Sequence, residues 1–101
     1  MFAVILCTSP REEAGRIAMA LVEEKLVACV NIGEVNSYFR WEGEMQEEGE
    51  ALLIIKTRAV KVREIIGRIR ELHSYEVPEI IALPIIDGHE GYLDWVRESV
   101  E

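Results

Sequence analysis

The sequence has few cysteines, no long apolar run and fewer basic than acidic residues, and each shortage excludes a class of protein. Its two cysteines have no CxxC or similar metal-type spacing, so neither a disulfide scaffold nor a zinc module is indicated. No apolar stretch approaches the roughly 20 residues of a membrane helix. The N-terminal MFAVILC lacks the basic region and the length of a signal peptide. We therefore expect a cytoplasmic protein with reduced thiols.

Charge and composition limit the partners. The chain carries 11 Lys and Arg against 19 Asp and Glu, a formal net charge of -8, which argues against a nucleic acid or an anionic membrane as partner. Half of the 101 residues are hydrophobic and 30% are charged, a balance typical of a globular domain with its own core. Since no linker, repeat or low-complexity segment interrupts it, residues 1–101 are predicted to form one domain.

The segment 27–57 is predicted to form a long β-hairpin. Its first arm shows no helical period and its second arm, EALLIIKT, is almost continuously apolar. Gly33 is expected to form a bulge. The glutamate-rich EGEMQEEG between the arms is expected to be a solvated turn, with loose binding of a hard cation or contact with a neighbouring subunit as alternatives. A hairpin that outgrows its sheet leaves backbone groups unpaired, which favours an oligomer.

The remaining elements follow from hydrophobic periodicity and from start and stop signals. Ser9 is predicted to cap the first helix, with Pro10 at its first position, and Pro84 indicates an edge strand or a bulge. The order β-α-β-β-α-β with a C-terminal helix is the ferredoxin-like α+β arrangement, an antiparallel sheet of order 4-1-3-2 with helices on one face. The predicted ranges are a strand over 2–8, a helix over 9–26, the hairpin, a helix over 61–72, a strand over 79–86 and a short last helix.

This topology predicts that several reactive side chains share one rim of the domain. The first and second strands run in the same direction, so Cys7 and Trp41 are expected at the same end. The second helix finishes there too, which adds His73 and Tyr75, and the acidic segment of the hairpin completes the rim.

The segments LVEEKLVACVNI, SYFRWEGE, LLIIKT, HSYEVPEIIALPI and YLDW occur in this order. Together they make the chain similar to the CutA family, the divalent-cation tolerance proteins, over nearly its whole length from Cys7 to Trp95. The resemblance implies a ferredoxin-like fold and a tight homotrimer assembled by strand pairing between chains, as in the PII-like trimers. It also implies a role in tolerance of, or response to, divalent metals, chiefly copper.

The resemblance further implies a copper site at Cys7 and His73, with the metal not required for folding. Some members have a second histidine where this chain has Leu72, which removes one ligand. A thiolate and an imidazole suit copper, and the position of Cys7 before a helix N-terminus is expected to lower its pKa. The alternative is that Cys7 is a small buried hydrophobic residue and His73 only a residue at a helix end.

A second functional hypothesis is a PII-like signalling or ligand-binding scaffold, with a small molecule or a protein in the clefts between subunits. An enzyme is not predicted, because the chain has no P-loop, HExxH or Ser/His/Asp pattern, and CTSPREE after the first strand is not a phosphate-cradling loop. The cleft residues expected for the scaffold are Trp41, Lys56, Tyr75 and Glu79.

Overall fold

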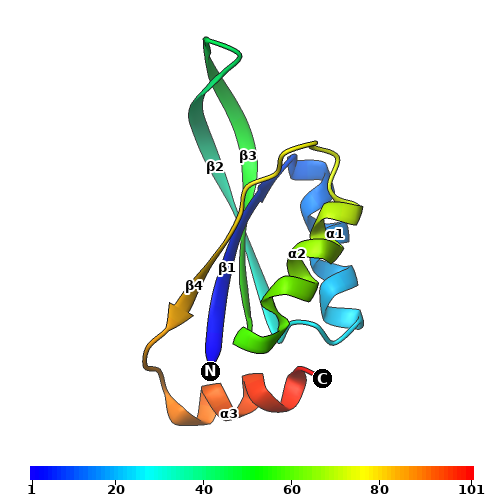
Figure 1. Ribbon diagram of the computed structural model, residues 1–101, viewed down its shortest axis with the longest axis vertical. Coiled ribbons are helices and arrows are strands. Elements are labelled where there is room, and N and C mark those ends of the chain that lie inside the picture. The colour runs from blue at the N-terminus through cyan, green and yellow to red at the C-terminus, as the bar shows by residue number, and fades with distance from the viewer.

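Four antiparallel strands and three α-helices make up the fold of the computed structural model, which describes residues 1–101 (Figure 1). The sheet order is β2-β3-β1-β4, the predicted order read from the other edge, so the ferredoxin-like α+β prediction is confirmed. The elements are β1 (Phe2–Ser9), α1 (Arg11–Glu23), β2 (Cys29–Trp41), β3 (Glu44–Arg58), the 3₁₀ turn η1 (Ala59–Lys61), α2 (Val62–Leu72), β4 (Ile80–Ile85) and α3 (Glu90–Ser99).

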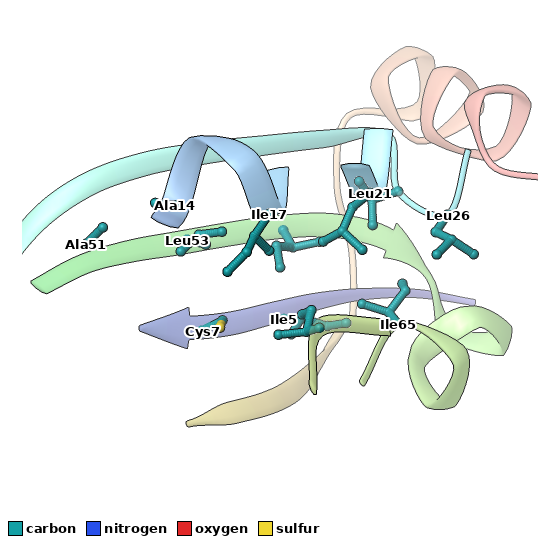
Figure 2. Close-up of a cluster of buried hydrophobic side chains, with 12 residues drawn as sticks. Ile5, Cys7, Ala14, Ile17, Leu21, Leu26, Ala51, Leu53 and Ile65 are labelled. Carbon is teal, nitrogen blue, oxygen red and sulfur yellow. The ribbon is translucent and has the colours of Figure 1, made fainter. Parts of the chain in front are cut away.

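The core lies between the sheet and the helices α1 and α2, which cover the same face (Figure 1). Because strand side chains alternate between faces, every second residue of β1 and β3 points towards the helices. Figure 2 shows this cluster, with the sulfur of Cys7 among the apolar side chains. Its buried members are Ile5, Cys7, Ala14, Ile17, Leu21, Leu26, Val27, Ala51, Leu53, Ile55, Ile65 and Ile69.

The opposite face of the sheet, here called the open face, is also apolar. It is formed by the alternate residues of the three strands β3, β1 and β4, and neither α1 nor α2 covers it (Figure 1). Ile81 and Leu83 on β4 are 50% and 46% exposed. The sheet therefore presents to its surroundings a face that has the composition of an interior. Its apolar residues are Val4, Leu6, Leu52, Ile54, Ile81 and Leu83, and Lys56, which pairs with Val4, lies on the same face.

The β2-β3 ladder runs without interruption from the pair Cys29–Lys56 to the pair Trp41–Glu44. The predicted bulge at Gly33 is therefore wrong, since Gly33 pairs in register with Leu52. A Cβ added at Gly33 would meet no atom within 4 Å, so no close approach of another segment requires the glycine at this position.

The prediction of a glutamate-rich turn is also wrong. The turn consists of Glu42 and Gly43, both with positive φ (51° and 82°), and the rest of the acidic segment belongs to β3. Two-residue turns with positive φ match the twist of the strands they join. The ladder therefore continues to the tip, and the carboxylates lie along a strand instead of in a loop.

The outer half of the hairpin, residues 35–50, extends beyond the rest of the sheet and is here called the distal hairpin (Figure 1). β1 ends at Ser9, opposite Ala51, so β3 beyond that point pairs only with β2. The protein is accordingly elongated, with a longest extent of 45 Å. Both edges of the distal hairpin carry backbone groups that no other strand of the chain pairs.

Helix α1 begins differently from the prediction. Ser9 is the last residue of β1, is fully buried, and donates its hydroxyl to the Pro10 carbonyl at 2.9 Å. Pro10 occupies the N-cap position and no side chain caps the helix. The predicted Ser9 cap is wrong because pairing with β3 extends β1 to this residue and buries its side chain. Glu12 and Glu13 in the first turn favour the positive end of the helix dipole instead.

Candidate functional site

A groove of about 750 Å³ lies between the distal hairpin and the loop 73–79, which joins α2 to β4. β2 and β3 form one wall with side chains that alternate along each strand, and the loop forms the other. The floor includes Thr8, near the end of β1. The groove is thus built by segments that are far apart in the sequence.

Aromatic side chains supply most of the apolar surface of the groove. Phe39 and Trp41 lie on the groove face of β2, and Tyr75 comes from the loop. Tyr38 borders the groove from the other face of β2, where its hydroxyl donates to Glu47. All four are partly exposed, with Trp41 at 51% and Tyr75 at 37%. Partly exposed rings around a hollow are a common feature of sites for small organic ligands.

Carboxylates supply its charge. Glu48 and Glu50 project from β3, and Glu76 and Glu79 from the loop. No lysine, arginine or histidine lines the groove. The lining of the groove is therefore acidic.

Glu50 is the most buried of these carboxylates, with an exposed fraction of only 5%. The Tyr75 hydroxyl donates to Glu50 Oε2 at 3.0 Å, while Oε1 accepts no hydrogen bond within the chain and no basic side chain pairs with the charge. Burial and the hydrogen bond to Glu50 raise the pKa of Tyr75 to about 12. Tyr75 consequently stays a hydrogen-bond donor across the physiological pH range.

His73 holds the start of the loop against the end of β1. The Tyr75 amide donates to His73 Nδ1 at 3.1 Å, so the ring proton lies on Nε2, which donates to the Thr8 carbonyl at 2.7 Å. The rings of His73 and Tyr75 are 4.9 Å apart between centroids. Both nitrogens of this 7% exposed imidazole are therefore used within the fold.

Cys7 lies on the core side of β1 and is fully buried. Its Sγ lies 3.6 Å from the Thr8 carbonyl, the same carbonyl that accepts from His73. Burial, together with the charges of Glu79 and Glu50, raises the pKa of Cys7 to about 12. The predicted lowering is wrong because the thiol points into the apolar cluster and not towards the free amides of α1.

Among the predicted site residues, the structure brings Trp41, Tyr75 and Glu79 into the groove. Lys56 lies elsewhere on β3, where its ammonium donates to the Asn31 side chain and to the Ile54 carbonyl. The residues expected to share one rim are instead spread along the hairpin, and Trp41 lies far from Cys7 and His73. The end of β1 is level with Glu34 of β2, so Trp41 lies roughly 20–25 Å further along the strand.

From the sequence, Glu48 and Glu50 are assigned to a solvated turn, and Glu76, Tyr38 and Phe39 are not singled out. The signal was available in the hairpin register, because residues paired across two strands share a face. Once the turn is placed at Glu42–Gly43, Phe39 faces Gln46 and Ser37 faces Glu48. Glu50 could not have been recognised in this way, because its burial depends on the loop 73–79.

The fold defines a ferredoxin-like α+β domain with an extended hairpin and a groove lined by acidic and aromatic side chains. The chain belongs to the CutA1 divalent ion tolerance protein family, whose sequence profile matches residues 3–99. This confirms the family that the sequence motifs indicated.

Individual relatives agree over the full length. The chain is 50% identical to the divalent-cation tolerance protein CutA of Thermus thermophilus over 101 residues, 98% of each chain. The structure of the periplasmic divalent cation tolerance protein CutA from Archaeoglobus fulgidus superimposes with a TM-score of 0.98 at 45% identity, covering 100% of both chains. The PII-like protein CutA from Nostoc superimposes with a TM-score of 0.94 at 36% identity, covering 98% of this chain and 97% of that one.

The relatives do not agree in cellular location. The Archaeoglobus fulgidus protein is called periplasmic, and an Arabidopsis thaliana relative, 45% identical over 95% of this chain and 54% of its own length, is called chloroplastic. No helix of the present structure has the length and apolar character needed to cross a membrane. The cytoplasmic location stays a prediction.

Proposed function

We propose that this protein acts in divalent-cation tolerance as a PII-like homotrimer that binds a ligand in the groove and is not an enzyme. The observation that carries the proposal is the groove itself, which holds a buried carboxylate without a cationic partner, Glu50, and is also lined by aromatic side chains. Its best-defined internal contact, between Tyr75 and Glu50, holds the wall in place. This arrangement is suited to binding, since none of its groups is paired as a nucleophile and a base.

The open face supports the homotrimer. An exposed, contiguous apolar surface is typical of a protein–protein contact, and here it is continued by the unpaired edges of the distal hairpin and of β4. Pairing these edges with other copies would satisfy backbone groups that the single chain leaves to solvent. Such an assembly would also place the groove next to a neighbouring subunit.

The trimer is tested by measuring the mass in solution by light scattering. We expect three times the 11.5 kDa chain mass. Ile81→Lys on the open face should lower that mass, because a charge would be buried without a partner. Val60→Lys, at a 73% exposed position of η1 away from this face, should leave it unchanged. A native protein with the mass of one chain would contradict the proposal.

The copper site at Cys7 and His73 stays a prediction. In its favour, both side chains lie at the carbonyl of Thr8. Copper would have to remove the proton of a thiol whose pKa is about 12 and to displace one of the two hydrogen-bond partners of the imidazole. Within the chain no three His, Cys, Asp or Glu residues are grouped to hold a metal ion.

Titration of the reduced protein with Cu²⁺ in competition with a chelator tests this site. The predicted site requires one tight equivalent per chain that disappears in Cys7→Ala, which removes the thiol without adding a polar group to the core. Weak binding that is equal in the native protein and in Cys7→Ala would contradict the site.

A further inference from the structure

We propose that His89 is an acid-sensitive cap of helix α3, so that a proton taken up by its imidazole releases the first turn of the helix. The inference concerns the end of the molecule opposite the distal hairpin (Figure 1) and is independent of the groove and of the predicted metal site. It follows from the hydrogen bond that His89 accepts, from the exposure of its ring and from the contacts of α3.

The side chain of His89 closes the N-terminus of α3. Its Nδ1 accepts a hydrogen bond from the Tyr92 amide at 3.1 Å, and its backbone carbonyl accepts one from the Leu93 amide at 3.0 Å. Amides in the first turn of a helix have no partner within the helix, so a side chain at the N-cap position satisfies them. Among the three α-helices only α3 has a side-chain cap, and this cap is a residue that titrates.

The bond from Tyr92 requires the neutral imidazole. A ring nitrogen that accepts from an amide carries no proton, so the proton of the neutral His89 ring lies on Nε2. In the imidazolium both nitrogens are donors, and an N–H on Nδ1 would face the N–H of Tyr92. The new positive charge would also lie at the positive end of the helix dipole. Protonation therefore removes the cap and leaves the Tyr92 amide without its partner.

Water has access to the ring, because His89 is exposed and belongs to none of the ion pairs of the chain. The titratable and charged groups at this end of the fold are Asp87, Glu90, Asp94 and Arg97 on α3 and its loop, and Cys29, Lys56, Arg58 and the amino group of Met1 on the strands.

These neighbours act on the proton in opposite directions. The carboxylates of Asp87 and Glu90 next to the cap favour its uptake, whereas the helix dipole and the cationic groups oppose it. Asp94 is paired with Arg97 at 2.7 Å. Between about pH 7 and pH 5, His89 is the member of this set whose charge ordinarily changes.

The first turn of α3 connects the cap to the sheet. Tyr92 lies against Cys29, the first residue of β2, and burial and this thiol raise the pKa of the Tyr92 hydroxyl. In the second half of the helix, Val96 is fully buried and the Arg97 guanidinium lies 5.2 Å from the centre of the Phe2 ring. Those later contacts do not depend on the cap. Acid should therefore loosen Tyr92 and the first turn while the second half of α3 stays in place.

Amide hydrogen exchange, followed by NMR on the full chain at about pH 7.5 and about pH 5, tests the inference. Rates are expressed as protection factors, which removes the intrinsic pH dependence of exchange. We expect the protection of the Tyr92 and Leu93 amides to fall by about tenfold at the lower pH. The amides of Glu98 and Ser99 should change by less than about twofold. The ring nitrogen signals of His89 should change from the Nε2–H tautomer to the imidazolium over the same range.

Variants assign the effect to the imidazole. His89→Asn supplies a cap that does not titrate, so the protection of Tyr92 should be nearly equal at both pH values. His89→Ala removes the cap and should show the low protection at both. Asp87→Asn is the matched control, since it keeps an acceptor for the Gly88 amide and removes only the neighbouring carboxylate. It should retain the pH dependence of the native protein.

Three results would overturn the inference. The first is equal protection of the Tyr92 amide at the two pH values in the native protein. The second is a fall at the lower pH that persists in His89→Asn or disappears in Asp87→Asn, because another group would then be the one that titrates. The third is an equal fall at Glu98 and Ser99, which would mean that acid acts on the whole helix and not on its cap.

Discussion

Replacing His73 by alanine is expected to lower the free energy of unfolding by about 2–4 kcal/mol, as measured by urea denaturation. The imidazole joins the Thr8 carbonyl to the Tyr75 amide, and its removal leaves both backbone groups without a partner. A buried polar group that loses its partner costs about 1–3 kcal/mol. Since Tyr75 forms part of the groove, the loop 73–79 should also lose protection from hydrogen exchange.

Two conservative variants separate the contributions of the two hydrogen bonds of His73 to the free energy of unfolding. His73→Asn places an amide oxygen near the position of Nδ1 and should retain the bond from Tyr75, whereas His73→Gln places an amide nitrogen near Nε2 and should retain the bond to Thr8. Each is expected to recover part of the loss. Ser74→Ala, at the exposed neighbouring position, should cost no more than about 0.5 kcal/mol. Equal stability of His73→Ala and Ser74→Ala would mean that the imidazole does not hold the loop.

Raising the pH from 9 towards 12 is expected to destabilise the protein by up to about 1.4 kcal/mol for each pH unit through Cys7. The thiol keeps its proton to about pH 12 in the folded state, against a reference pKa of 9.0. Above pH 9 the unfolded chain therefore binds fewer protons than the folded chain, and stability falls as the pH rises. Below pH 9 the thiol is protonated in both the folded and the unfolded chain, so the free energy of unfolding does not depend on pH through Cys7.

Chemical denaturation at a series of pH values measures the slope. Cys7→Ala removes the titrating thiol and should show a smaller slope over the same range, with a constant loss from the small cavity that it leaves. Tyr75, whose pKa is also raised to about 12, contributes in the same direction, so Tyr75→Phe is the control for its share. Identical slopes for the native protein and Cys7→Ala would show that the thiol ionises without hindrance.

For the two residues of the predicted copper site, the sequence predicts their position but not their chemical state. Cys7 and His73 both lie at the end of β1, as the order of the elements predicted. The pKa of the thiol and the free lone pairs of the imidazole depend on what packs around them, and the sequence does not encode that locally. In this structure the imidazole of His73 holds the loop 73–79 through its two hydrogen bonds, and the thiol of Cys7 packs in the core.

The sequence by itself determined the order of the elements and which residues of each element face the core. These follow from hydrophobic periodicity, which is local and has a period of its own in strands and in helices. The strand order was predicted from the arrangement that this order of elements usually adopts. The tertiary structure decided the groove, because Glu50 becomes buried only where the loop 73–79 crosses the sheet. It also decided the end of β1 at Ser9 and the pairing of the acidic strand to its tip, since strand pairing is a contact between distant segments that overrides a local cap or a run of charge.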